Sequence, residues 1–250
     1  MSKPLSFLYG IICYALFLFS FLYAIGFVGN MFVPKSIDSG PESSVARALI
    51  INMAMLGLFA VQHTIMARPA FKRWWTKIVP VHVERSTFVV VTSLLLILLY
   101  WQWRPMTTVI WSVEHPVGKA VLMGVFWIGW GIVLLSTFMV NHFDLFGLRQ
   151  VYLHLRDQEY HHVTFTTSGL YRYVRHPIML GFIIAFWATP HMTAGHLLFA
   201  LATTAYIVVG IQFEERDLRE FIGKAYEDYR RRVPMLIPLL KKRNTETDTA

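Results

Sequence analysis

Arg175 and His176 precede Pro177 at the start of an apolar stretch, and this order of residue types favours anion binding. Proline fits the first position of a helix, because its missing N–H group has no intrahelical acceptor there. The helix start then presents free backbone N–H groups and the positive end of the helix dipole beside an arginine and a histidine. The sequence therefore predicts a receptor for a carboxylate or a phosphate at this point.

A pair of acidic residues, Glu214 and Glu215, ends the last long apolar stretch and offers the opposite chemistry. Carboxylates accept hydrogen bonds from an ammonium group or from ribose hydroxyls. S-adenosylmethionine carries a carboxylate, an ammonium group and a ribose, so it fits both halves, and its sulfonium suits an aromatic ring. The residues expected to bind it are Tyr171, Tyr173, Arg175, His176, Pro177, Glu214 and Glu215, with Trp187 as a further candidate ring.

The elements that must position these groups are membrane helices. Of the 250 residues, 55% are hydrophobic and 15% are charged, whereas a soluble domain carries about 25% charged residues. The apolar segments are Leu5–Val28, Val45–Met66, Ser86–Trp103, Gly118–Val140, Pro177–Thr189 and Thr193–Phe213. The first four approach or exceed the roughly 20 residues that a helix needs to cross the bilayer. The fifth is too short to cross alone, so we expect it to form a helical hairpin with the sixth.

The expected fold class is an all-α integral membrane protein with five to six transmembrane helices, forming one domain over residues 1–240. Its parts are four N-terminal spans (1–140), a cytoplasmic loop (141–176), and a cofactor-binding hairpin with an interfacial helix (177–240). The charged stretch Glu214–Arg232 predicts that interfacial helix. The apolar segment Val233–Leu240 is expected to pack back on the membrane face, and residues 241–250 to form a disordered tail.

Lys and Arg are distributed unevenly between these segments. Nineteen lie on the side that carries both termini and the 141–176 loop, and four lie on the other side. Cytoplasmic loops carry the excess of Lys and Arg in membrane proteins. We therefore expect cytoplasmic termini, a multi-pass protein of the bacterial inner membrane, and membrane lipids as partners.

In this topology, polar residues from segments far apart in the sequence meet at one cytoplasmic depth. They are His63, Asn141–Phe146, Arg175-His176 and Glu214-Glu215. Each alone has a simpler interpretation, as a basic membrane anchor, a hydrogen-bonded histidine of the bundle, or the first solvated turn after a span. Ionisable groups near membrane spans are costly, however, and together they favour a binding site.

Other classes of site are not expected. Cys13 is the single cysteine and lies in an apolar run, so the chain has neither a disulfide framework nor a cysteine metal site. The sequence contains no HExxH or Cys/His metal pattern, no GxGxxG motif, no P-loop and no nucleophile elbow. The cationic runs Arg230–Arg232 and Lys241–Arg243 favour contact with anionic lipids over nucleic acid.

The stretches "GLYRYVRHPIMLG" and "EERDLREFIGKAYEDYRRRVPMLIP" resemble the C-terminal half of the isoprenylcysteine carboxyl methyltransferase and phospholipid methyltransferase superfamily, over roughly residues 168–240. The matching positions are Arg175-His176-Pro177, Gly181, Glu214-Glu215, Gly223, Tyr226, Tyr229, Pro234 and Pro238. The resemblance implies a methyltransferase that uses S-adenosylmethionine, and it adds Gly181 to the cofactor-binding residues. Met179 stands where the superfamily commonly has tyrosine, so no role is carried over to that position and the acceptor stays open.

The N-terminal stretches "QHTIMARPAFKRWW", "ERSTFV" and "NHFDLFGLRQVYLHL" resemble a bacterial branch of that superfamily, the methanethiol S-methyltransferases and their NnrU-like relatives. This resemblance implies S-methylation of methanethiol, a small volatile thiol, to dimethyl sulfide. The thiolate is the nucleophile, so a base is expected near the sulfur. His142 and Asp144 are the candidates, with Asp144 orienting the imidazole or acting itself, and Arg149 is expected to steady the anion.

Two alternatives stay open at this point. The first is a related membrane methyltransferase that acts on another small thiol, a lipid amine or a carboxylate. The second is a non-enzymatic NnrU-like accessory protein of nitrogen-oxide metabolism that uses its histidines for haem or signalling. The sequence leaves open the oligomeric state and which of Glu214 and Glu215 touches the cofactor.

Overall fold

The computed structural model describes residues 1–161, 163, 165 and 167–238, which are mainly helical. Five of its helices are long and apolar enough to cross a membrane. They are α1 (Lys3–Gly29), α2 (Val45–Ala67), α4 (Val81–Gln102), α5 (Pro116–Val140) and α9 (Ala194–Ile222). The shorter apolar helix α8 (Pro177–Trp187) is paired with α9. The all-α membrane fold and the C-terminal hairpin are therefore confirmed, whereas the expected tail over 241–250 lies outside the described residues.

Smaller elements connect these helices. They are α3 (Pro69–Trp75), α6 (His142–Leu145), α7 (Leu148–Leu155), the 3-10 helix η1 (Gly169–Arg172), α10 (Lys224–Arg232), and the strands β1 (Val109–Ser112) and β2 (His191–Thr193). The strands pair antiparallel, with Val109 opposite Thr193. The sequence predicted a plain turn between α8 and α9. The strand pair was missed because β1 and β2 lie about 80 residues apart along the chain.

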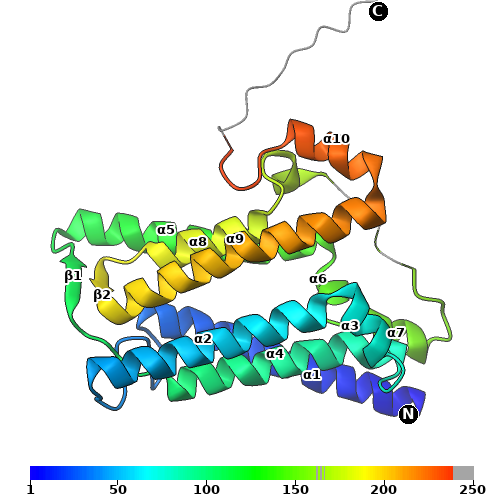
Figure 1. The fold of residues 1–250 in the computed structure, drawn as a ribbon, viewed down its shortest axis with the longest axis horizontal. Coiled ribbons are helices and arrows are strands. Elements are labelled where there is room, and N and C mark those ends of the chain that lie inside the picture. Colours follow the sequence, from blue (N-terminus) through cyan, green and yellow to red (C-terminus); the bar gives the residue numbers. More distant parts are fainter. Residues whose placement is uncertain (162, 164, 166, 239–250) are drawn as a thin grey trace, which may run out of the picture.

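The long helices form two layers. Figure 1 shows α1, α2 and α4 in one layer and α5, α8 and α9 in the other, with the strand pair at one end of the molecule. The opposite end carries the N-terminus, α3, α6, α7 and α10 (Figure 1). All the polar segments singled out in the sequence therefore lie at the same end of the bundle, as their expected depth in the membrane required.

Large aromatic rings fill the contact between the two layers. Phe27 of α1 meets the rings of Trp103 and Phe199 edge to face, with centroids 5.9 and 6.2 Å away. Trp103 is fully buried, and its indole N–H donates to the Ile37 carbonyl, so its polar atom is satisfied. This core lies away from the polar end and holds the two layers together.

Helices α5 and α8 cross at unusually short range because each contributes a glycine. A Cβ on Gly181 would lie 2.7 Å from the Gly129 carbonyl oxygen, and one on Gly129 would lie 2.7 Å from the Ala185 nitrogen. Small residues permit such close backbone approach between membrane helices. The packing of α8 on α5 therefore explains Gly181 by itself, and its predicted contact with the cofactor stays a prediction.

The single interfacial helix predicted over Glu214–Arg232 is broken in two. Gly223 has φ +70°, a conformation that residues with a side chain rarely adopt, and it ends α9 at Ile222. The chain then turns back as α10, which buries Tyr226 and Tyr229 beside α9. The break at Gly223 shapes the site, because a continuous helix would carry these tyrosines away from it.

The segment after α10 returns to the start of α8. The backbone N–H of Arg175 donates to the Pro234 carbonyl at 2.9 Å, and that of His176 donates to the Met235 carbonyl at 3.2 Å. The first residues of Val233–Leu240 therefore pack back onto the start of α8, and their expected place at the membrane face stays a prediction. The entrance of α8 is thus built from two stretches about 60 residues apart in sequence.

Candidate active site

Glu215 lies at the centre of the polar cluster formed by α8, α9 and α10. Its Oε1 accepts from Arg175 Nε at 2.7 Å and from His176 Nε2 at 3.1 Å, and it lies 2.6 Å from Arg175 Nη2. Its Oε2 lies 3.2 Å from Arg230 Nε. The Glu215 side chain is only 5% exposed, and both of its oxygens are engaged. Glu215 is therefore the hub that joins the three helices.

Arg175 is held on every side by the protein. Besides its ion pair with Glu215, its Nη1 donates to the carbonyls of Arg230 at 3.2 Å and Val233 at 2.5 Å. Five donors in a planar fork allow one arginine to join several elements in this way. Arg175 was predicted as a direct ligand of the cofactor, and here its nitrogens are already occupied by protein acceptors.

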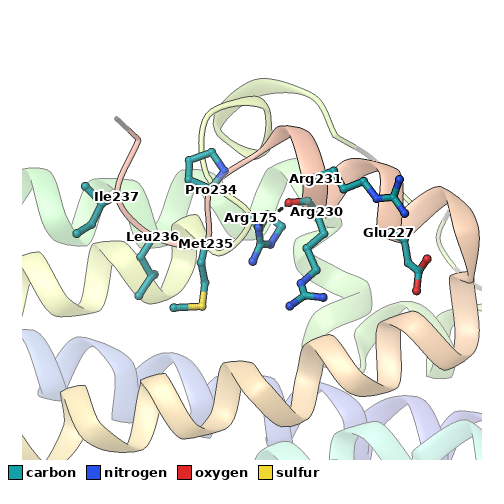
Figure 2. A pocket seen from close by; sticks show the side chains of 8 residues that line it. All are labelled: Arg175, Glu227, Arg230, Arg231, Pro234, Met235, Leu236 and Ile237. Atoms are coloured by element: carbon teal, nitrogen blue, oxygen red, sulfur yellow. Dashed lines mark hydrogen bonds between the residues drawn. The ribbon is translucent and has the colours of Figure 1, made fainter. Parts of the chain in front are cut away.

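An open cleft of about 610 Å³ lies beside this network, which is within the size range of small-molecule sites. Figure 2 shows Arg175 and Arg230 beside the extended segment that runs from Pro234 to Ile237. Its lining comprises Arg175, Glu227, Arg230, Arg231, Pro234, Met235, Leu236 and Ile237. The cleft therefore combines cationic groups on one side with an apolar segment on the other.

Glu214 differs from its neighbour, because its side chain is 45% exposed and accepts no hydrogen bond from the described residues. The nearest basic group is His176, with Nδ1 3.6 Å from Glu214 Oε2. The imidazole thus lies between the two acids, since its Nε2 bonds to Glu215. Glu214 is the acid of the pair that is free to accept a ligand donor.

The two tyrosines of α10 complete the cluster. Burial raises the pKa of Tyr229 to about 12, so its phenol is neutral and donates to the Tyr171 carbonyl at 2.5 Å. Burial also raises the pKa of Tyr226, with Glu215 adding to the effect. The Tyr226 hydroxyl is buried and has no hydrogen-bond partner among the described residues. Buried polar groups are normally satisfied, so an orphan hydroxyl fits a site that a polar ligand completes.

The three rings expected near a sulfonium are separated. Tyr171 is half-buried, and burial, followed by Glu214, raises the pKa of its phenol. Tyr173 is 63% exposed. Trp187 lies at the far end of α8, about 15 Å along the helix from Pro177, and its indole donates to Thr204. Trp187 thus lies away from the entrance of α8, whereas Tyr171 is close enough to Glu214 to interact with it. Which ring contacts the sulfonium stays a prediction.

His142 stands in a separate aromatic cage after α5. Its ring stacks on Phe138, with centroids 4.4 Å apart. Thr137 donates its hydroxyl hydrogen to the Leu134 carbonyl, so it accepts from His142 Nδ1 at 2.8 Å. Tyr14 of α1 then donates to His142 Nε2 at 2.8 Å. Burial lowers the pKa of His142, so the ring is neutral and its Nε2 is a proton acceptor.

Asp144 does not orient this imidazole, contrary to one of the two roles predicted for it. Its Oδ1 accepts from Arg149 Nη1 at 2.9 Å and its Oδ2 from the Tyr160 hydroxyl at 3.3 Å. The two ring nitrogens of His142 are occupied by Thr137 and Tyr14 instead. Arg149 is likewise committed, because it also donates to the His161 carbonyl at 3.0 Å. Asp144 and Arg149 thus fix the loop that carries His142.

Sequence reasoning missed several residues of the site. Arg230 was interpreted as a lipid contact, yet it pairs with Glu215, and its own carbonyl accepts from Arg175. Tyr14 was read only as part of a membrane span. A polar residue inside an apolar run was the available signal for Tyr14, and the spacing from Tyr226 through Tyr229 to Arg230 was the signal for α10. In the part of the chain that the structure describes, no group of three His, Cys, Asp or Glu side chains is arranged to hold a metal.

Comparison with known proteins agrees with this geometry. Residues 118–226 match the phospholipid methyltransferase family, a range that spans α5, α8, α9 and the start of α10. Methanethiol S-methyltransferase of Mycobacterium tuberculosis is 56% identical over 95% of this chain and 98% of its own length. Methanethiol S-methyltransferase 2 of Bradyrhizobium diazoefficiens is 56% identical (96% and 93%), and the Crocosphaera subtropica enzyme is 50% identical (98% and 96%). No solved structure gives a significant match. The chain therefore belongs to the methanethiol S-methyltransferase family, a group of membrane-embedded methyltransferases.

Proposed function

We propose that this protein transfers the methyl group of S-adenosylmethionine to methanethiol, giving dimethyl sulfide, S-adenosylhomocysteine and a proton. The observation that carries this proposal is the contact of His176, at the entrance of α8, with the acid pair of α9. That contact joins the start of α8 to the acids of α9, the two groups of residues expected to hold one S-adenosylmethionine molecule. In addition, relatives named methanethiol S-methyltransferase match this chain over almost its whole length. When bound, the cofactor supplies an electrophilic methyl group on a positively charged sulfur.

The residues present suit this cofactor. Glu214 has an exposed carboxylate for an ammonium group or a ribose hydroxyl, and the Tyr226 hydroxyl lacks a partner among the described residues. The first amides of α8 have no intrahelical acceptor and suit a carboxylate. Arg175 and Glu215 act as positioning residues, because their polar atoms are engaged in holding α8, α9 and α10 together.

The acceptor thiol must lose its proton, and His142 is the proposed base, acting through Tyr14. As the S–H bond breaks, its electron pair stays on sulfur and the proton passes to the Tyr14 oxygen. The Tyr14 hydroxyl proton moves to His142 Nε2 along the existing 2.8 Å hydrogen bond. The rings of Phe138, Phe143 and Phe146 surround His142, which is only 6% exposed. Such an apolar setting favours a reaction that turns opposite charges into neutral sulfides.

The polar end of the bundle is proposed to face the cytoplasm of the bacterial cell. The excess of Lys and Arg on that side supports this orientation, with nineteen residues against four. A charged cofactor then reaches the cleft from the aqueous side. Methanethiol is small and apolar, so it is free to enter through the lipid.

The test is headspace gas chromatography of purified protein in detergent, supplied with methanethiol and S-adenosylmethionine. Dimethyl sulfide is expected only when both are present. Parallel reactions with a longer thiol, a lipid amine and a carboxylate, using radiolabelled methyl donor, compare the alternative acceptors. Methylation of one of these in preference to methanethiol, or no methylation by folded protein, would overturn the proposal.

A further inference from the structure

A second group of cations lies at the same end of the bundle, between the end of α2 and the start of α4. Arg68 is paired with Asp217 of α9 at 2.8 Å, and this ion pair ties the two layers together. Lys72 of α3 and Arg85 of α4 have no carboxylate within ion-pair distance in the described residues. Neither cation takes part in the cofactor cluster. Two half-buried cations that lack an ion-pair partner are costly, which suggests that a ligand supplies the missing anion.

The guanidinium of Arg85 contacts the protein through its Nε and its planar face. Its Nε donates to the Leu145 carbonyl at 2.7 Å, and its Cζ lies 5.1 Å from the centre of the Phe88 ring. These contacts hold the planar group in place, and no hydrogen bond to the described part of the chain uses its terminal nitrogens. The protein therefore orients Arg85 and leaves its two Nη groups for another acceptor.

Lys72 and His63 lie close to this guanidinium. Burial lowers the pKa of Lys72, and Arg85 lowers it further. The His63 ring packs on Phe88, the ring that also contacts Arg85, with the two ring centroids 5.0 Å apart. The His63 Nδ1 is buried and has no hydrogen-bond partner among the described residues. Glu84 interacts with both cations, whereas Asp217 acts on Lys72 and Asp144 on Arg85. Asp217 and Asp144 are already paired with Arg68 and Arg149, so four cations face three acids and one excess positive charge remains.

The surroundings of this cluster are apolar. Met66, Phe88 and Val89 form a buried cluster there, and Phe146 packs against it. The Phe146 ring also lies 4.8 Å from that of His142. The cationic cluster and the base proposed above thus share an aromatic wall, although they come from different helices. A ligand that is anionic at one atom and otherwise apolar suits such a place.

We propose that Lys72, Arg85 and His63 form the binding site for the acceptor in its thiolate form. This inference rests on the proposed function, since it assigns the place where that acceptor binds. A thiolate satisfies the excess positive charge with a single atom, and its methyl group lies against the aromatic wall. The carboxylate of the cofactor is the competing occupant. However, the first amides of α8 already suit that carboxylate, and Glu214 of α9 suits the ammonium group beside it.

The experiment compares Lys72→Gln, Arg85→Gln and the conservative Lys72→Arg with Arg73→Gln. Arg73 is the matched control, because it is exposed on the same helix, one residue from Lys72. For each variant, KM for methanethiol and KM for S-adenosylmethionine are measured from pH 6 to 9. Binding of thiocyanate, a non-reactive anion, is measured by calorimetry without cofactor. Thermal melts establish whether each variant is folded. If Arg85→Gln fails to fold, the comparison of Lys72→Gln with Arg73→Gln decides the test.

Loss of a cation disfavours the thiolate, so KM for methanethiol at pH 7 is expected to rise about tenfold, equivalent to about one unit in the pKa of the bound thiol. KM for S-adenosylmethionine stays unchanged, and Arg73→Gln behaves as wild type. Lys72→Arg keeps the charge and raises KM for methanethiol less than Lys72→Gln does, and thiocyanate binding weakens in Lys72→Gln and Arg85→Gln. Higher KM for the cofactor with unchanged KM for the thiol would overturn the inference, as would no change in either. If wild-type protein binds thiocyanate through these residues yet methylates no thiol, the proposed function fails and the anion site alone remains.

Discussion

Glu215→Gln tests whether the cluster of α8, α9 and α10 depends on one buried charge. The substitution keeps the size of the side chain and removes the carboxylate that faces Arg175 and Arg230. Arg175 is 7% exposed at its side chain, so it would be left as a buried cation. Removing one partner of a buried ion pair typically costs about 3–5 kcal/mol. Because Arg175 still donates to two carbonyls, we expect the lower end, about 3 kcal/mol.

The matched control is Glu214→Gln, one residue earlier on the same helix. Its side chain is 45% exposed, and its closest basic nitrogen, Nδ1 of His176, is 3.6 Å away. Exposed pairs contribute about 0–1 kcal/mol, so we expect almost no change in stability. Binding of S-adenosylmethionine should nevertheless weaken, because Glu214 is the acid that is free to accept a ligand donor. The two variants therefore separate the support of the site from contact with the ligand.

The assay is thermal unfolding in detergent, followed by tryptophan fluorescence, with a titration of S-adenosylmethionine at a temperature where both variants are folded. For a chain of this length, about 3 kcal/mol corresponds to a fall in Tm of roughly 6–12 °C. Glu215→Gln should show this fall, and Glu214→Gln should keep the wild-type Tm while losing affinity. An unchanged Tm for Glu215→Gln, or a larger fall for Glu214→Gln, would refute the assignment of Glu215 as the hub.

Two further predictions concern α5 and the cage of His142. Gly181→Ala places a Cβ 2.7 Å from the Gly129 carbonyl, so unfolding should become easier by about 1–3 kcal/mol; Gly131→Ala, in open space on α5, is the control, and equal melts of the two variants would contradict the close crossing. His142→Ala and Tyr14→Phe should spare the binding of S-adenosylmethionine and lower kcat with methanethiol by about 10²-fold or more, as for loss of a general base; unchanged kcat in initial-rate assays of both would remove the proposed proton path.

The helical spans could be predicted from the sequence because they depend on local composition. A run of about 20 apolar residues crosses a bilayer whatever its neighbours are. Alternation of the spans then fixes which loops share an end, so the meeting of Arg175 and His176 with Glu214 and Glu215 followed without coordinates and is confirmed. The aromatic core and the close approach of Gly129 to Gly181 could not be predicted, since they depend on how each helix is rotated about its axis.

The chemistry of neighbouring residues was decided by the tertiary structure. Glu214 and Glu215 are identical in type, yet a rotation of about 100° along α9 buries one among three basic side chains and leaves the other exposed. His142 and Asp144 are two residues apart, and each takes partners from a different element. The sequence by itself determined which residues reach the polar end of the bundle. Their roles depend on side-chain directions and on contacts between distant segments, which only the packed helices establish. Glu215 and Arg175 are 40 residues apart in the chain, and His142 and Tyr14 are 128 apart.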